Sequence, residues 1–349
     1  MAHSCLHIYY SALLFTPTGT KLFETYTGTV LDRVHVGGHR EPTWSPLLVV
    51  MNHEKDVHEV IFSPDSHRIA SRSGTLVRLW DGSTGEHVLT LEGHSGDISS
   101  MAFSPNSHQV ATGSSDKTGR LWDGSTGEYV SMLKGHSGDV WSVAFSPDSH
   151  RVATESWDKM VQLWDGSTGK HVSTLEGQSG TILSMAFSPD SRRIATRSEE
   201  EMVQLWDGST GKHVSTLEGH SGTISSMAFS LDSRRVATKS KDKTVQLWDG
   251  TGKHVSTLKG HSGTISSMAF SLDSCRVATG SAEKTVQLWD GSTGKHVSML
   301  EGHSGHISSM VFSSDSRRVA MGSADKTVRL WDGSMGKHVS TLEGHSGAI

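Results

Sequence analysis

The stretch GHSGTISSMAFSLDSRRVATKSKDKTVQLWDGTGKHVSTL, Gly219 to Leu258, decides the fold of this chain. It contains four short runs, ISSMAFS, RVAT, TVQLWD and HVSTL, which are separated by Gly, Asp and Ser residues. These are the residues that form tight turns, because they tolerate left-handed backbone or cap it with a side chain. Short runs bounded in this way predict four β-strands joined by hairpins.

The same phrase recurs along the chain. Its tryptophan stands at positions 80, 122, 164, 206, 248, 289 and 331, at intervals of 42 residues except for one of 41. The short interval reads WDGTGK where other copies read WDGSTGK, so the missing serine lies in a turn. A four-stranded unit with apolar residues on both faces cannot bury itself, whereas a radial arrangement lets each unit cover the next. We therefore predict an all-β chain of seven four-stranded antiparallel blades.

The GH…D…WD pattern at this period resembles the WD-repeat family of β-propellers, over about 290 of the 349 residues. The resemblance implies a hydrogen-bonded tetrad of His, a Ser or Thr, Asp and Trp in each blade. The sequence alone leaves Thr112 and Ser114 as alternatives for the hydroxyl. With the serine chosen, the tetrads are His94, Ser114, Asp116 and Trp122; His136, Ser156, Asp158 and Trp164; His220, Ser240, Asp242 and Trp248; and His303, Ser323, Asp325 and Trp331.

Three copies depart from this tetrad. The first, which His53 opens, has a deletion near Gly74 and no aspartate, the fourth has Gln178 and Glu200, and the sixth has Glu283. Because a buried hydrogen bond contributes roughly 1 kcal/mol net, we expect blades one, four and six to be less stable than the others.

Several classes of function are disfavoured. The net charge is −5 and no apolar run approaches 18 residues, so neither nucleic-acid binding nor a membrane span is expected. Cys5 and Cys275 are too few for a disulfide framework, which favours the cytoplasm. A His–Asp–Ser trio that recurs in many blades beside a Trp is typical of a structural device. CxxC, HExxH and Walker motifs are missing. We expect no enzyme, cofactor or metal.

The repeats differ from one another mainly at positions that lead into the first strand and follow the second. In a propeller both loops lie on the same rim, while the opposite turns, PDS and DGSTGK, hardly vary. Trp141 and Trp157 are extra tryptophans in the third copy, and Trp is a frequent binding hot spot. We therefore predict a partner-binding rim made of Asp56, His58, Arg72, Asp139, Trp141, Glu155, Trp157, Thr181, Leu183, Arg197, Glu199, Lys239, Lys241 and His306.

Outside the repeats, we expect residues 1–44 to be a linker segment, partly helical or irregular, and residues 45–349 to be the propeller with a truncated eighth repeat. Blade seven can take its outer strand from residues 45–53 or from residues 338–345. IYYSALLFTPTGTKLF, followed by WSPLL, resembles the joint before the repeat array of fungal NACHT–WD-repeat proteins. Those are NOD-like (STAND-type) signal-transducing NTPases of non-self recognition and heterokaryon incompatibility. The resemblance implies a sensor region without its NTPase domain.

The first functional hypothesis is thus a non-enzymatic recognition and scaffold module for signal transduction, monomeric unless it is part of a larger chain. Its partner is a protein, or alternatively a glycolipid-type ligand. The second hypothesis is a constitutive WD-repeat adaptor in a ubiquitin-ligase or signalling complex. An incomplete gene copy without function is a further alternative.

Overall fold

The computed structural model describes residues 50–53, 55–177, 180–199, 202–344 and 347. All regular elements in this part of the chain are β-strands. They form seven sheets, and each sheet consists of four strands consecutive in sequence. The predicted all-β fold with seven four-stranded antiparallel blades is therefore confirmed. The expected linker, residues 1–44, lies outside the described residues.

Equivalent strands have nearly the same length in every blade. The first strands are β1 (Glu59–Phe62), β5 (Ile98–Phe103), β9 (Val140–Phe145), β13 (Ile182–Phe187), β17 (Ile224–Phe229), β21 (Ile265–Phe270) and β25 (Ile307–Phe312). The second strands are β2 (Arg68–Ser73), β6 (Gln109–Ser114), β10 (Arg151–Ser156), β14 (Arg193–Ser198), β18 (Arg235–Ser240), β22 (Arg276–Ser281) and β26 (Arg318–Ser323).

The third strands carry the repeated tryptophan. They are β3 (Leu76–Asp81), β7 (Thr118–Asp123), β11 (Val161–Asp165), β15 (Val203–Asp207), β19 (Val245–Asp249), β23 (Val286–Asp290) and β27 (Val328–Asp332). The fourth strands are β4 (His87–Leu91), β8 (Tyr129–Lys134), β12 (His171–Leu175), β16 (His213–Leu217), β20 (His254–Leu258), β24 (His296–Leu300) and β28 (His338–Leu342).

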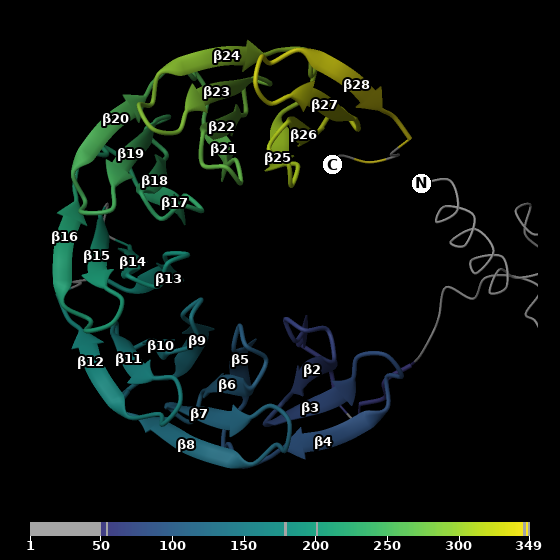
Figure 1. Ribbon diagram of the computed structural model, residues 1–349, viewed down its shortest axis with the longest axis vertical. Helices are drawn as coiled ribbons and strands as arrows, with labels where there is room; N and C mark the ends of the chain where they lie inside the picture. Colours follow the sequence, from purple (N-terminus) through teal and green to yellow (C-terminus); the bar gives the residue numbers. More distant parts are fainter. Residues whose placement is uncertain (1–49, 54, 178–179, 200–201, 345–346, 348–349) are drawn as a thin grey trace, which may run out of the picture. The chain divides into compact units, whose positions relative to one another are not determined.

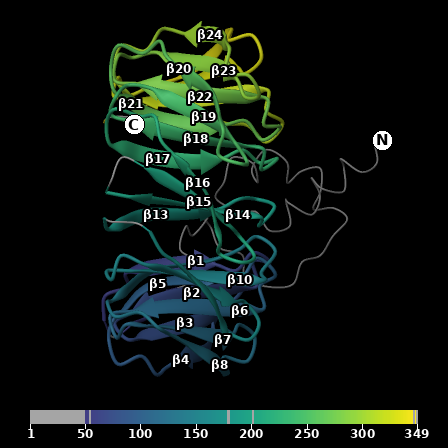
Figure 2. The same ribbon diagram turned by 90° about the vertical axis from the view of Figure 1, so that its left-hand side faces the viewer.

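Each blade runs outward from its first strand to its fourth. Figure 1 shows the blades following one another around an arc, with the first strands toward its centre and the fourth strands at its periphery. Figure 2 shows the same strands running between two rims, along which the connecting loops gather. The loop into the first strand and the turn after the second share one rim, as hairpin geometry requires. We call this rim the variable rim.

The turns on the opposite rim have a common internal structure. In blade five, Ser230 Oγ donates a hydrogen bond to the Asp232 carboxylate at 2.6 Å, and the backbone N–H of Arg234 donates to the same carboxylate at 3.0 Å. Ser233 between them has a left-handed backbone, with φ of 60°. The repeated PDS or LDS phrase therefore forms a closed side-chain-capped turn, which explains why it hardly varies.

The hydrophobic core is divided among the junctions between blades. Between blades four and five, Val203, Leu205 and Leu217 of the earlier blade pack against Ile224 and Trp248 of the later one. Corresponding clusters join each blade to the next from blade one to blade seven. The repeated tryptophan therefore belongs to the core and is not available for binding.

Blade seven takes its outer strand from β28, the 338–345 phrase of the two alternatives. Of the other phrase, residues 45–53, only 50–53 are described, and they lie in no strand. Among the described residues, no hydrophobic cluster joins blade seven to blade one, which occupy the two ends of the arc (Figure 1).

Candidate interaction surface

A hydrogen-bonded network fixes the loops of the variable rim to the strands beneath them. In blade two, His94 Nδ1 lies 2.8 Å from the Asp116 carboxylate, and His94 Nε2 lies 2.8 Å from Thr112 Oγ1. The same hydroxyl accepts the indole N–H of Trp122 at 3.0 Å. Burial lowers the pKa of His94, although the hydrogen bond and the negative charge of Asp116 act in the opposite direction. The network recurs in blade three with His136, Thr154, Asp158 and Trp164, and in blade five with His220, Thr238, Asp242 and Trp248.

The hydroxyl of this network is a threonine, which corrects the choice of Ser114, Ser156, Ser240 and Ser323. Thr112 and Ser114 are two residues apart in β6, so both point to the same face of the sheet. Only Thr112 lies between the two rings. Ser114 Oγ instead donates to the Gly96 carbonyl at 2.9 Å and accepts the N–H of Asp116 at 3.1 Å, so it closes the neighbouring loop.

Blade seven has lost part of the network although its histidine, aspartate and tryptophan are all present. Met321 occupies the position of the threonine in β26. His303 Nδ1 keeps its contact with Asp325 at 2.8 Å. His303 Nε2 and Trp331 Nε1 are buried and have no hydrogen-bond partner among the described residues. The sequence pattern missed this defect because the pattern was matched on Ser323.

Blade six, by contrast, keeps its network. Glu283 replaces the aspartate, and its carboxylate lies 2.6 Å from His261 Nδ1. Thr279 accepts the indole N–H of Trp289 at 2.9 Å. The bond whose loss underlies the prediction of a less stable blade six is therefore present, because the longer glutamate side chain still reaches the histidine. Burial acts to raise the pKa of Glu283, but hydrogen bonds from Ser262 and His261 hold it at about 2.

Blades one and four keep at least the tryptophan part of the network. In blade four, Trp206 Nε1 donates to Thr196 Oγ1 at 2.8 Å, while Gln178 and Glu200 lie outside the described residues. In blade one, Ser71 takes the place of the threonine. Its hydroxyl accepts the indole N–H of Trp80 at 2.6 Å and lies 3.0 Å from His53 Nε2.

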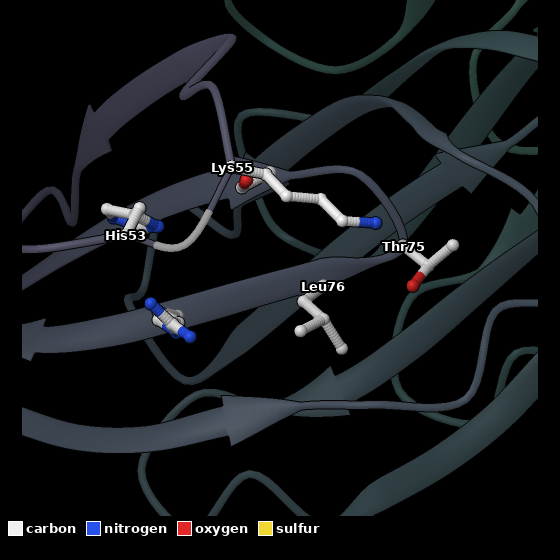
Figure 3. A pocket seen from close by; sticks show the side chains of 6 residues that line it. His53, Lys55, Thr75 and Leu76 are labelled. Carbon is white, nitrogen blue, oxygen red and sulfur yellow. The ribbon is translucent and has the colours of Figure 1, made fainter.

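A pocket lies beside the turn of blade one in which the aspartate of the network is absent. The shortened turn at Gly74 contains no carboxylate, and His53 Nδ1 is buried without a hydrogen-bond partner among the described residues. Burial, and then the positive charge of Arg78, lower the pKa of His53, so its ring is neutral. Figure 3 shows the pocket beside this turn, which is lined by His53, Lys55, Ser73, Thr75, Leu76 and Arg78.

Two tryptophans form an aromatic pair on the variable rim of blade three. The ring centroids of Trp141 and Trp157 are 6.5 Å apart, and the ring planes are tilted by 42°. Trp157 is 64% exposed, whereas Trp141 is half-buried. The backbone N–H of Trp157 donates to the Asp139 carbonyl at 3.0 Å, which ties the turn after β10 to the loop before β9. The pair is therefore held on a fixed loop, with one ring face open.

Not all predicted rim residues lie on the surface. The exposed ones are Asp56, His58, Trp157, Leu183, Glu199, Lys241 and His306, and Asp139, Trp141 and Thr181 are half-buried. The other four, Arg72, Glu155, Arg197 and Lys239, stand at the end of the second strand and point into the junction with the next blade.

The residues at the end of the second strand act between blades. Arg72 Nη1 donates to the Ile98 carbonyl of blade two at 2.6 Å. Arg197 and Lys239 reach the next blade in the same way, with donor–acceptor distances of 2.9 and 2.7 Å. These side chains therefore bridge neighbouring blades; Lys239 is buried, and Arg72 and Arg197 are half-buried.

Glu155 occupies the same position between blades three and four. It is 1% exposed, and its Oε1 has no hydrogen-bond partner among the described residues. Burial raises its pKa to about 7, although a hydrogen bond from Ser142 and the positive charge of Arg197 act in the opposite direction. Burial therefore favours the protonated form of Glu155, which can donate a hydrogen bond inside the junction.

Among the described residues, no group of three or more His, Cys, Asp or Glu side chains could hold a metal ion. The same part of the chain contains no helix that is long and apolar enough to cross a membrane. Five network histidines each contact an aspartate or glutamate of their own blade: His94, His136, His220, His261 and His303.

Radial four-stranded blades, tied at one rim by His–Thr–Trp networks, define a β-propeller protein. A comparison with protein families finds the same periodicity: the family described as "WD domain, G-beta repeat" matches residues 44–81, 85–123, 127–165, 169–207, 211–249, 252–290 and 294–332. The chain belongs to the WD40 repeat family. Its repeats form a scaffold for binding protein partners, and propellers of this family are generally non-enzymatic.

Among solved structures, the crystal structure of the computationally designed Ika8 protein is similar to this chain. The sequences are 26% identical, the TM-score is 0.62, and the match covers 85% of this chain and 90% of that one. No curated protein matches the sequence.

Proposed function

We propose that the chain is a recognition module whose partner-binding surface is centred on Trp157, on the variable rim of blade three. The exposure of this side chain carries the proposal, because 64% of its surface is open to solvent. An exposed tryptophan on a fixed loop is a typical hot spot, where a partner removes a large apolar area from water without ordering a flexible segment.

Other exposed apolar side chains support this location. Met160 follows Trp157 in the same turn, and Leu183 lies near the start of β13 in the next blade. Both are exposed, and the corresponding positions in blade five are Thr244 and Ser225. Blades two, six and seven likewise carry threonine and serine at these two positions, so the apolar character is not a general property of the repeat, which fits a binding surface.

We further propose that the partner is a protein, with a glycolipid-type ligand as the alternative. Nearly identical repeats that differ on one rim are expected in the ligand-sensing region of a fungal NACHT-type signalling protein of non-self recognition, the family that the N-terminal segment resembles. Such a protein acts in the cytoplasm. The free, exposed thiol of Cys275 is compatible with that reducing compartment.

The test compares two exposed apolar side chains on opposite rims. Trp157→Ala removes the proposed hot spot, and Met335→Ala removes a side chain that is 67% exposed in a turn between third and fourth strands. The variants are immobilised, and the proteins that they retain from an extract of the source organism are quantified. We expect at least a tenfold loss for Trp157→Ala, as for a hot spot of about 2 kcal/mol, and no loss for Met335→Ala.

Both variants should melt at the temperature of the unchanged chain, because neither side chain belongs to a core cluster. Equal retention by Trp157→Ala and Met335→Ala would contradict the assigned surface.

A further inference from the structure

Each internal junction of the arc joins two different faces. The earlier blade contributes Val and Leu residues from its third and fourth strands, and the later blade contributes residues of its first three strands, including the tryptophan. Between blades five and six, for example, Leu247 and Leu258 meet Ile265, Val277 and Trp289. The internal junctions thus show what normally covers each kind of face.

In the part of the chain that the structure describes, no blade covers the face that blade seven presents to a following blade. Leu342 of β28 is 57% exposed, whereas its counterpart in blade six, Leu300, is 2% exposed. Val328 and Leu330 of β27 are only half-buried, although the equivalent residues of the other blades are completely buried. An apolar surface built for a blade junction is therefore open to water.

Likewise, no blade formed by the described residues covers the complementary face of blade one. Phe62 of β1 is 61% exposed, and the equivalent Phe103 of blade two is 9% exposed. Val60, on the same face, is exposed where Met101 is buried. Phe103 and Met101 pack against blade one, so the face with Phe62 and Val60 is built to receive a preceding blade.

The approach to blade seven is also sterically open. Gly113 and Gly280 are the next-to-last residues of the second strands of blades two and six. A Cβ on Gly113 would come within 2.8 Å of the Val140 side chain of the next blade, and a Cβ on Gly280 within 2.6 Å of that of Met310. Blade seven has Gly322 at this position. At this position blade seven therefore lacks a long bridging side chain, such as Arg72 or Lys239, that would hold a following blade at a distance.

Closure of the arc on itself is disfavoured by the packing of the other junctions. To bring Phe62 to Leu342, the internal junctions would all have to shift, but their leucines, such as Leu163 and Leu247, are completely buried. Interiors packed at this density do not deform continuously. The two open faces therefore call for an additional element.

We propose that these two faces are the two halves of one docking site, and that its occupant is a further four-stranded blade of the same repeat pattern. Toward blade seven the occupant presents Ile, Phe and Trp, and toward blade one it presents Val and Leu. A single blade has both faces, so one occupant covers both ends of the arc. This site involves blades one and seven and is separate from the Trp157 surface.

The test supplies such a blade. The chain is extended after Ile349 by a copy of Ser308–Leu342, which continues the repeat in register. Hydroxyl-radical labelling, read by mass spectrometry, measures the accessibility of Phe62 and Leu342, with Phe103 and Leu300 as internal references. We expect the labelling rate of Phe62 to fall about sevenfold, which is the ratio of the exposures of Phe62 and Phe103, 61% to 9%.

A matched extension carries aspartate in place of the copies of Leu330 and Leu342, which form the face toward blade one. It should protect Leu342 but leave Phe62 labelled. Three results would overturn the proposal. If Phe62 is labelled as slowly as Phe103 in the unextended chain, the arc closes on itself; if Phe62 and Leu342 are protected in a dimer seen by light scattering, a second copy is the occupant. The third such result is that the extension protects neither residue while Phe103 and Leu300 stay protected.

Discussion

Blades five and seven have nearly the same residues, but their second strands differ at two positions, and one of the two belongs to the hydrogen-bonded network. Thr238 in blade five accepts the indole N–H of Trp248, whereas Met321 in blade seven leaves that of Trp331 without a partner among the described residues. Both tryptophans are nevertheless buried, and both blades form the same sheet. Packing and the strand ladders therefore suffice to form a blade, and the threonine adds stability to a blade that forms without it.

The largest expected effect is the loss of the tryptophan itself. Trp248→Ala should lower the free energy of unfolding by roughly 3–5 kcal/mol, because it leaves a cavity at the junction with blade four. Trp331→Ala should cost about 1 kcal/mol less, because no hydrogen bond is lost with it. Urea unfolding followed by circular dichroism measures both. Equal losses for the two variants would contradict the inferred difference in hydrogen bonding between the two blades.

Transferring the defect of blade seven to blade five should have the next largest effect. Thr238→Met leaves Trp248 Nε1 buried without a partner and removes the hydroxyl contact of His220 Nε2, which keeps only the backbone carbonyl of residue 238 at 3.1 Å, so we expect a loss of about 2 kcal/mol. Thr238→Ser is the matched control, since Ser71 holds the same two rings in blade one. A loss as large for the serine variant would show that the methyl group, not the hydroxyl, is what matters.

Repairing blade seven should have a smaller and opposite effect. Met321→Thr supplies a hydroxyl to His303 and Trp331, and we expect a gain of about 1 kcal/mol, since the loss of methionine packing offsets part of the new hydrogen bonding. Met321→Val, which has a similar shape to threonine but no hydroxyl, should give no gain. Stabilisation by valine as great as by threonine would contradict the role of the hydroxyl.

The smallest effect concerns acid stability in blade six. The pKa of Glu283 is about 2 in the folded chain and 4.5 in a free glutamate. A depressed carboxyl pKa stabilises the fold above the unfolded value and loses this contribution as the pH falls through the folded value. Glu283→Gln should therefore cost about 1 kcal/mol at pH 7, discounted because the carboxylate is partly solvated. The cost should vanish near pH 2.

Exposed Glu301→Gln is the control for this measurement and should change nothing at either pH. A Glu283→Gln variant whose deficit does not depend on pH would mean that the glutamate acts through packing and not through its charge.

The sequence predicted the fold well because its information is periodic. The tryptophan spacing and the turn residues are local signals, and repetition reinforces each of them. The sequence could not choose between Thr112 and Ser114, because residues two apart share a face of a strand. It also could not show that Glu283 still reaches His261, since side-chain reach is a matter of tertiary distance.

The rim was predicted less completely. Trp157 is exposed as a surface contact should be, but Glu155 and Lys239 are buried between blades. In the sequence these positions vary like surface loops, because the space between two blades is filled differently at each junction. Some junctions have a glycine at this position, and others have a long side chain that bonds to the next blade. Variation among repeats therefore indicates either a partner surface or a junction, and only the structure separates the two.

The most direct test of the central claim is the hydrogen-exchange rate of the indole N–H groups of the repeated tryptophans, measured by NMR. The structure shows hydroxyl partners for Trp80, Trp122, Trp164, Trp206, Trp248 and Trp289. We predict slow exchange for these six and exchange at least about tenfold faster for Trp331, which corresponds to a hydrogen bond of about 1.4 kcal/mol. Exchange of Trp331 as slow as that of Trp248 would contradict the claim that the threonine hydroxyl holds the ring.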